Sequence, residues 1–319
     1  MFKIINGNLI NKRLARFDDS LIPKLGYEDH IGGQEKALCA TGIEIRIVLN
    51  KSELNFKFHS SAPGKLVLYI GSYSIEEKNV NAGLNEFKIC LHDRYISYNP
   101  KPSSDYPDNM FRIVFGKGFQ VTDFEIDDRD SIDFRLDKPK MVAYGSSFTE
   151  GVGAFSYEYS YINILKNTLN IDILNKALSG NCLCELEMAE YLKGIDTDYY
   201  LLELGMNMRG MMDEKEFSKR VSAFLKVLVS TNRKIFIISS VDFFKEKYQI
   251  YKEQDPYYER NILYSNVLHD IAKKYNIPLI PLSDLLDSYS DISSDMLHPS
   301  AYGHLKLGLN LAKILKNFI

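Results

Sequence analysis

Four short blocks, far apart in the chain, carry side chains that could act together in nucleophilic catalysis. The first block places Ser147 in a glycine-flanked turn, and the last places Asp295 three residues before His298. Between them lie the Ser-Gly-Asn block at 179–181 and the Gly-Met-Asn block at 205–207. A serine hydroxyl is a weak nucleophile by itself, so it needs a base within hydrogen-bond reach and donors for the oxyanion that forms. The four blocks contain candidates for each of these roles.

In this order, the four blocks resemble the motifs of the SGNH (GDSL) hydrolase superfamily. The resemblance implies that Ser147 is the nucleophile, that His298 is the general base and that Asp295 orients the imidazole. It also implies an oxyanion hole formed by the backbone N–H groups of Ser147 and Gly180 and the side-chain amide of Asn207. It implies no metal or organic cofactor.

Two letters of the blocks depart from the commonest pattern of the superfamily. Ser146 stands where the GDS block has an aspartate, and Met208 stands where the GxND block has its aspartate. Neither position belongs to the implied triad, so the departures concern the support of the turn rather than the chemistry. The resemblance covers residues 141–319. The YGSS, SGNC and LGMN forms of the blocks suggest a subgroup with a β-sandwich domain in front.

Each candidate residue also has a purely structural explanation. Ser147 could cap the helix that follows it, and His298 could be a surface residue at the start of the last helix. Asp291 or a backbone carbonyl could take the place of Asp295 beside the histidine. A second histidine, His304, is expected on the surface of the last helix.

Length and charge limit the classes of protein to consider. With 319 residues, of which 45% are hydrophobic, the chain is long for one domain, so two domains are expected. The 39 basic residues are scattered and balanced by 42 acidic ones, which gives a net charge of −3. This balance argues against a nucleic-acid partner.

The N-terminal residues and the cysteines bear on location. The first 19 residues carry several charges and no uninterrupted apolar core, so they do not form a signal peptide. No stretch approaches the roughly 20 apolar residues that span a bilayer. We therefore expect a cytoplasmic protein without a membrane partner. Four cysteines do not make a disulfide framework and fit a reducing compartment: Cys39, Cys90, Cys182 and Cys184.

The N-terminal part of the chain shows hydrophobic alternation with a period of two residues. The alternation recurs over residues 43–49, 54–58, 66–70, 87–91, 111–115 and 132–136, with turn signals between the runs. This spacing is typical of antiparallel strands with one face turned inward. It predicts a β-sandwich of jelly-roll type over residues 1–137, which could serve as a substrate-binding or carbohydrate-binding domain.

From residue 138 onward, strands alternate with longer helical stretches. Strands are expected at 141–144, 171–174, 199–204, 234–239 and 277–280, and helices at 157–169, 183–192, from 213, at 256–275 and after 299. This order predicts an α/β domain over residues 138–319, a three-layer flavodoxin-like fold with a mostly parallel sheet. Ser147, Gly180 and Asn207 follow the first three strands, at the sheet edge where such folds bind ligands.

These observations together predict a serine esterase that hydrolyses a short-chain carboxylic ester through an acyl-enzyme. The family resemblance suggests a small molecule or a carbohydrate as the substrate, for example an O-acetyl sugar. Two alternatives remain open: an acyltransferase that uses the same triad, and a carbohydrate-binding protein without catalytic activity. The sequence does not indicate the oligomeric state.

Overall fold

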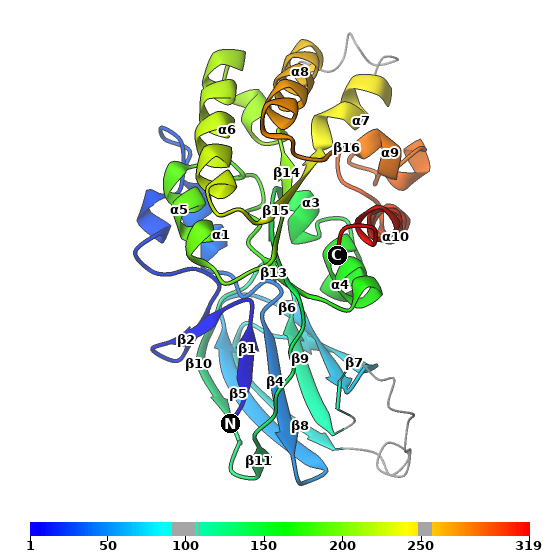
Figure 1. Cartoon of the computed structure of the whole chain (residues 1–319). Coiled ribbons are helices and arrows are strands. Elements are labelled where there is room, and N and C mark those ends of the chain that lie inside the picture. The colour runs from blue at the N-terminus through cyan, green and yellow to red at the C-terminus, as the bar shows by residue number, and fades with distance from the viewer. Residues whose placement is uncertain (91–105, 108, 248–256) are drawn as a thin grey trace. The chain divides into compact units, whose positions relative to one another are not determined.

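A computed structural model describes residues 1–90, 106, 107, 109–247 and 257–319 of the chain (Figure 1). Its internal contacts divide the chain into two units. The first unit comprises Met1–Asp18, Leu38–Lys138 and Ser156–Glu158, and the second comprises Asp19–Ala37, Pro139–Phe155 and Tyr159–Ile319. The expected boundary at residues 137 and 138 stays a prediction. The contacts differ from it chiefly in one segment, because residues 19–37 pack with the second unit.

The first unit consists of antiparallel strands, as predicted. They are β1 (Lys3–Ile5), β2 (Asn8–Ile10), β3 (Arg13–Ala15), β4 (Glu44–Leu49), β5 (Glu53–Ser60), β6 (Gly64–Ile70), β7 (Tyr73–Val80), β8 (Gly83–Cys90), β9 (Met110–Phe115), β10 (Val121–Ile126) and β11 (Ser131–Ile132). One sheet has the order β1-β4-β9-β6-β7, with β11 beside β4, and the other has the order β2-β3-β10-β5-β8.

Alternating side chains of the two sheets form one core. Along β5, Leu54, Phe56 and Phe58 are buried, whereas Lys57 and His59 between and after them are exposed. The ring of Phe58 meets that of Phe115 from the other sheet edge-on, with the centroids 5.4 Å apart. The period of two in the sequence therefore corresponds to one inward face per strand, and the predicted antiparallel β-sandwich is confirmed.

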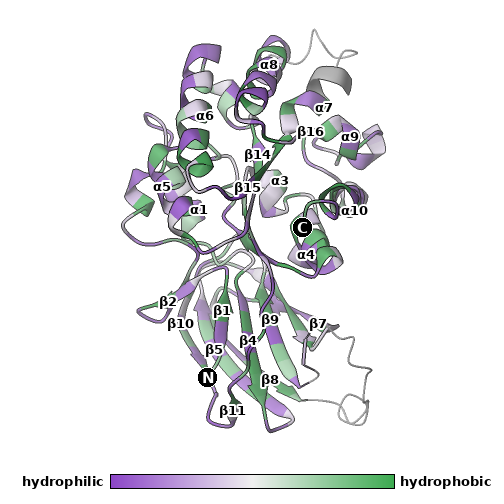
Figure 2. Ribbon diagram, viewed as in Figure 1, coloured by the Kyte–Doolittle hydropathy of each residue, from purple (hydrophilic) through white to green (hydrophobic). Residues whose placement is uncertain are grey.

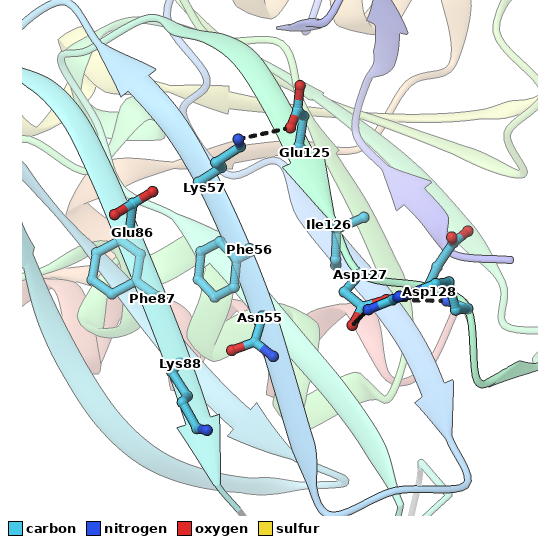
Figure 3. Close-up of a pocket in the computed structure, with 11 residues that line it drawn as sticks. Asn55, Phe56, Lys57, Glu86, Phe87, Lys88, Glu125, Ile126, Asp127 and Asp128 are labelled. Atoms are coloured by element: carbon cyan, nitrogen blue, oxygen red, sulfur yellow. Dashed lines mark hydrogen bonds and ion pairs between the residues drawn. The ribbon is translucent and has the colours of Figure 1, made fainter.

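A shallow pocket of about 680 Å³ lies over β5, β8 and β10 of the sandwich (Figure 3). Phe56 and Phe87 are among its lining residues, and their rings, which pack in the sandwich core, stack with centroids 5.1 Å apart. Two pairs of its charged side chains form ion pairs: Lys57 contacts Glu125 at 3.0 Å, and Arg129 contacts Asp127 at 2.9 Å. The pocket surface thus carries charges of both signs.

The second unit contains a five-stranded parallel sheet with helices. Its strands are β12 (Lys140–Tyr144), β13 (Asp172–Asn175), β14 (Tyr199–Leu204), β15 (Lys234–Ser239) and β16 (Leu279–Pro281). Its α-helices are α1 (Gly32–Ala37), α3 (Ser147–Glu150), α4 (Tyr161–Leu169), α5 (Leu186–Gly194), α6 (Glu214–Val229), α7 (Ser240–Lys247), α8 (Tyr258–Tyr275), α9 (Leu282–Leu285) and α10 (Ala301–Leu315). Its short 3₁₀ helices are η1 (Ile22–Lys24), η3 (Met208–Gly210) and η5 (Tyr289–Asp291), whereas η2 (Tyr157–Tyr159) belongs mostly to the first unit.

Both faces of the parallel sheet are covered. Apolar side chains of α4, α7, α9 and α10 share one core with Met141, Ala143 and Ile238 of the sheet. On the opposite face, Phe224 of α6 stacks on Tyr144 of β12, with the centroids 5.2 Å apart. The strands and α10 are largely hydrophobic, whereas α6 and α8 carry hydrophilic residues as well (Figure 2). The predicted three-layer α/β fold is confirmed.

The strand order of this sheet is β13-β12-β14-β15-β16, with every neighbouring pair parallel. The chain leaves β12 to form the edge strand β13, then crosses to the other side of β12 to form β14. In such sheets the connections on either side of the reversal diverge and leave a crevice beyond the carboxyl ends of the strands. The segments that follow β12 and β14 therefore border the expected binding crevice.

None of the helices in the described part of the chain has the length and hydropathy that crossing a bilayer requires.

Candidate active site

Ser147 is the first residue of the short helix α3, directly after the turn that ends β12. Ser146 precedes it as the N-cap, with an extended backbone and a side chain that accepts a hydrogen bond from the N–H of Phe148. Gly151 closes the helix with φ of +95°. The side chain of Ser147 is therefore held at the carboxyl end of β12, where it is largely buried.

His298 and Asp295 continue a hydrogen-bonded chain that starts at Ser147. The distance between Ser147 Oγ and His298 Nε2 is 2.7 Å, and that between His298 Nδ1 and Asp295 Oδ2 is 2.6 Å. Partial burial raises the pKa of Asp295, but hydrogen bonds from Ser293 and His298 outweigh burial and lower it well below its ordinary value. An ionised Asp295 accepts a hydrogen bond from Nδ1–H of His298, which leaves Nε2 as the acceptor for the hydroxyl of Ser147.

A tight turn between Ser293 and His298 positions the acid. Asp295 Oδ1 accepts hydrogen bonds from the hydroxyl of Ser293 at 2.6 Å and from the N–H groups of Leu297 and His298 at 2.9 and 3.0 Å. Ser293 N–H in turn donates to the carbonyl of His298 at 2.7 Å. One carboxylate thus caps the turn with one oxygen and contacts the imidazole with the other.

Gly180 lies in the loop after β13, which runs beside the turn of Ser147. Leu178 N–H donates to the carbonyl of Gly145 at 3.0 Å, and Ser179 N–H donates to Glu150 Oε2 at 2.9 Å. Gly180 has φ of +73°, and no atom lies within 4 Å of the position that a Cβ would take. This left-handed backbone conformation favours glycine, and open space faces the position.

Asn207 follows β14 and is tied to the same loop. Its Oδ1 accepts a hydrogen bond from the N–H of Cys182 at 3.0 Å. Within the described ranges, no acceptor hydrogen-bonds to Asn207 Nδ2, to Gly180 N–H or to Ser147 N–H. Three potential donors therefore follow three neighbouring strands at the carboxyl edge of the sheet, each without an acceptor among the residues that the structure describes.

This arrangement holds a serine against an oriented imidazole, with unpaired donors on adjacent loops. A scan against family models matches residues 138–316, more than half of the chain, to the GDSL-like Lipase/Acylhydrolase family. The chain belongs to this family. A search of curated proteins by sequence gave no match.

Solved structures share the fold of the whole chain at low identity. A salicylyl-acyltransferase from a tetracycline biosynthetic pathway is 13% identical, with a TM-score of 0.76, over 99% of this chain and 95% of that one. A family two carbohydrate esterase from Cellvibrio japonicus is 10% identical, with a TM-score of 0.66, over 99% and 94%. A family two carbohydrate esterase from Clostridium thermocellum, in complex with cellohexaose, is 14% identical, with a TM-score of 0.60, over 87% and 92%. These likenesses agree with the sandwich-plus-α/β architecture of the family member described here.

Sequence reasoning missed Glu203, a buried acid of β14 behind the turn of Ser147. Its Oε2 accepts hydrogen bonds from the backbone N–H and the hydroxyl of Ser146, both at 2.6 Å, and from Thr149 Oγ1 at 3.3 Å. Burial raises the pKa of Glu203 above its ordinary value, and these hydrogen bonds offset part of the rise. A signal was present, because central parallel strands are nearly continuous apolar runs and a glutamate interrupts this one.

His304 is not on the surface of the last helix, as the sequence suggested, but fully buried. Its Nε2 lies 2.8 Å from the carbonyl of Val152, and the N–H of Tyr161 donates to its Nδ1 at 3.3 Å. Its ring also stacks on that of Tyr161. His304 therefore links α10, which follows His298 in the chain, to Val152 and Tyr161, which follow Ser147.

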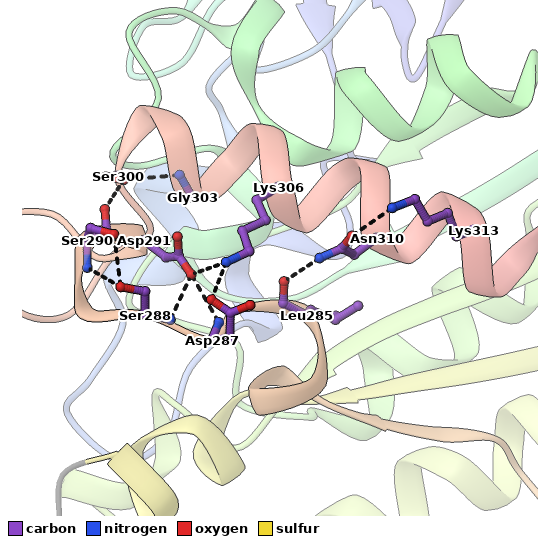
Figure 4. A network of polar contacts seen from close by, with 10 residues as sticks. All are labelled: Leu285, Asp287, Ser288, Ser290, Asp291, Ser300, Gly303, Lys306, Asn310 and Lys313. Carbon is purple, nitrogen blue, oxygen red and sulfur yellow. Dashed lines mark hydrogen bonds and ion pairs between the residues drawn. The ribbon is translucent and has the colours of Figure 1, made fainter.

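Residues 292–299 form the loop that carries His298, called the histidine loop below. Asp291 lies at the base of this loop (Figure 4). It is fully buried, and its Oδ2 accepts hydrogen bonds from the N–H groups of Asp287 and Ser288 at 3.0 Å and from Lys306 Nζ at 2.9 Å. Its own carbonyl accepts from the N–H of Ser300 at 2.7 Å. The structure thus gives the carboxylate of Asp291 partners other than His298.

The segment of residues 19–37 contacts the loop that carries Gly180. His30 Nε2 lies 3.1 Å from the carbonyl oxygen of Gly180, and Gly26 N–H donates to Glu185 Oε1 at 3.0 Å. Nothing in the local sequence pointed to these contacts, because they join residues 150 or more positions apart.

Proposed function

We propose that this protein is a serine esterase that hydrolyses short-chain carboxylic esters. The observation that carries the proposal is the continuous chain from Ser147 Oγ through His298 to Asp295, with both hydrogen bonds at 2.7 Å or less. A base in contact with the hydroxyl, itself oriented by an acid, is the arrangement that activates a serine.

In the proposed mechanism, Ser147 Oγ attacks the ester carbonyl while His298 Nε2 takes the hydroxyl proton. The resulting oxyanion accepts hydrogen bonds from Ser147 N–H, Gly180 N–H and Asn207 Nδ2, the three donors that no protein acceptor engages. His298 then protonates the leaving alcohol, and the acyl group remains on the serine. In the second half, His298 takes a proton from water, the hydroxide attacks the acyl-enzyme, and the acid and free Ser147 are restored.

For the substrate class, we propose an O-acetylated carbohydrate. The support is the full-length fold shared with family two carbohydrate esterases. We also propose that the sandwich contributes to carbohydrate binding. The shallow pocket over β5, β8 and β10, which charged side chains of both signs line, is the region of that unit to test first.

Hydrolysis rates on acetylated sugars and on nitrophenyl esters of increasing chain length would test the proposal. We expect acetyl esters to be hydrolysed fastest, with rates that fall as the acyl chain lengthens, and no turnover by Ser147→Ala. Absence of ester hydrolysis by the wild-type protein on every substrate would contradict the esterase function.

An acyltransferase is the second candidate, because a salicylyl-acyltransferase shares the fold over almost the whole chain. The two functions diverge only when the acyl-enzyme meets water or another alcohol. Product analysis in the presence of rising concentrations of sugar alcohols distinguishes them. A transferase would form the new ester at the expense of free acid, whereas an esterase would keep releasing acid.

A further inference from the structure

Glu203 sits at the centre of the second unit, where an ionisable side chain is unexpected. It belongs to β14, which lies between β12 and β15 in the parallel sheet. Only 2% of its surface is exposed, and its neighbours in the strand are Leu202 and Leu204. Burying a carboxyl group is unfavourable unless hydrogen bonds compensate, so a buried acid here requires a set of dedicated donors.

The donors lie mainly in the turn that presents Ser147, and the side chain of Ser240 at the start of α7 also hydrogen-bonds to Glu203. The backbone N–H and the hydroxyl of Ser146 each lie 2.6 Å from Glu203 Oε2, and Thr149 Oγ1 lies 3.3 Å away. Ser146 and Thr149, on either side of Ser147, therefore both hydrogen-bond to Glu203 Oε2. The hydroxyl of Ser147 itself is hydrogen-bonded to His298 rather than to Glu203.

Gly145 shows how closely the acid approaches the turn. A Cβ at this position would lie 2.8 Å from Glu203 Oε2 and 2.9 Å from Glu203 Cβ, and closer still to Thr149 Oγ1. A side chain at residue 145 is therefore incompatible with this packing. Gly145 thus allows Glu203 to approach the turn closely, because it has no side chain.

We infer that Glu203 is a positioning residue for the nucleophile, which holds the 145–149 turn so that Ser147 Oγ meets His298 Nε2. The inference rests on the proposed function of Ser147. It also explains why Ser146 can stand where the superfamily pattern has an aspartate. The carboxyl group beside this turn comes from Glu203 on the neighbouring strand β14, and residue 146 itself supplies only a hydroxyl. Glu203 touches neither substrate nor reacting atoms in this account and acts through Ser146 and Thr149.

The test compares Glu203→Gln and Glu203→Ala with Asp242→Asn, a matched control. Asp242 is a second buried acid of the same unit, but it accepts a hydrogen bond from the hydroxyl of Ser265 in α8 rather than from the turn. The measurements are kcat and KM on a short nitrophenyl ester, the rate of labelling by a fluorophosphonate, and thermal unfolding.

Displacement of a reacting group by about 1 Å can lower a rate by about 10²-fold. We expect Glu203→Ala to lower kcat and the labelling rate by about that factor, with KM changed less than about 3-fold. Glu203→Gln keeps an acceptor oxygen and should lose only about 10-fold. Asp242→Asn should stay within about 2-fold of wild type in both rates, because its effect is on stability alone.

The outcomes separate the inference from the proposed function. If wild type is labelled and both Glu203 variants are labelled as fast as Asp242→Asn, the positioning role is wrong while the esterase function stands. If Glu203→Ala does not fold, the ratio between the labelling rates of Glu203→Gln and Asp242→Asn decides. If wild type is not labelled at all, the proposed function is wrong, and the positioning role that rests on it is overturned with it.

Discussion

The two halves of the candidate site are built in different ways. Every residue of helix α3, which begins with Ser147, is buried. The turn before it hydrogen-bonds to Glu203, a buried acid of the parallel sheet. The histidine loop is open by comparison. The side chain of Asp295 is 48% exposed, and Met296 beside it is half exposed with φ of +58°. Ser147, the proposed nucleophile, is thus fixed by the sheet, whereas His298, the proposed base, is fixed by a short loop at the surface.

This difference indicates which contacts fix the position of each half of the site. The loop is held at its base by Asp291 and Lys306 and by a bridge between Ile292 and Pro299. It then closes on the nucleophile segment at Gly153, where a Cβ would collide with the carbonyl of Pro299. We therefore expect substitutions on the nucleophile side to act mainly on the chemistry, and substitutions at the loop base to act mainly on stability.

The largest expected effect comes from removing the base. His298→Ala should lower kcat by roughly 10⁴-fold or more, because Ser147 then has no proton acceptor. Groups that act as a unit are not additive, so the double variant Ser147→Ala with His298→Ala should be no slower than either single variant. Steady-state kinetics on one nitrophenyl ester measures all three. A double variant slower by the product of the two single effects would mean that the two residues act independently.

The next effect concerns the donors at the sheet edge. Loss of one preorganised oxyanion donor typically lowers kcat by about 10²- to 10³-fold, so we expect Asn207→Ala to fall in that range with a small change in KM. Asn310→Ala, which removes a surface amide of α10 bonded to Leu285, serves as the control and should leave kcat unaltered. A normal kcat for Asn207→Ala would remove Asn207 from the proposed oxyanion hole.

A smaller effect is expected at the exposed acid. Loss of the orienting acid costs about 10⁴-fold in the buried serine-protease triad, and water can partly replace a carboxylate that is half exposed. Asp295→Asn should therefore lower kcat at neutral pH by at least roughly 10-fold. If its kcat matched that of wild type, His298 would have to work without an orienting carboxylate, and the triad would be reduced to a dyad.

The smallest effect on chemistry is expected at Asp291. Asp291→Asn removes one partner of the Lys306 ion pair and weakens two buried hydrogen bonds, which should destabilise the second unit by about 1–3 kcal/mol. Activity below the unfolding transition should change less than about 3-fold, because Asp291 does not contact His298. Chemical denaturation together with kcat measures both. A large loss of kcat without loss of stability would contradict the division of roles between Asp291 and Asp295.

Much of the fold followed from the sequence. The strands predicted at 199–204 and 234–239 coincide with β14 and β15, and Asp213 caps α6 where the sequence placed the start of a helix. Apolar runs and N-caps are local signals, so they are readable without the tertiary structure. The helix predicted from residue 157 begins only at Tyr161, because Ser160 caps it and a 3₁₀ turn precedes it.

The supporting contacts of the site were less predictable. The blocks indicated which segments meet, but not that Glu203, His304 and residues 19–37 hold them. Each of these contacts joins positions 50 or more residues apart, and none leaves a local period or cap in the sequence. The interrupted apolar run at Glu203 was the one visible anomaly, and its meaning depends on β12 lying beside β14.

Identification of the residue that a fluorophosphonate modifies tests the central claim most directly. After labelling of the wild-type protein and proteolysis, mass spectrometry should find the adduct on Ser147 alone, although Ser146 is its immediate neighbour. Ser147→Ala should take up no label, and Ser146→Ala should still be labelled, because Glu203 keeps its bond to the backbone N–H of residue 146. An adduct on Ser146, or an unlabelled wild-type protein under conditions that label a known serine esterase, would contradict the account.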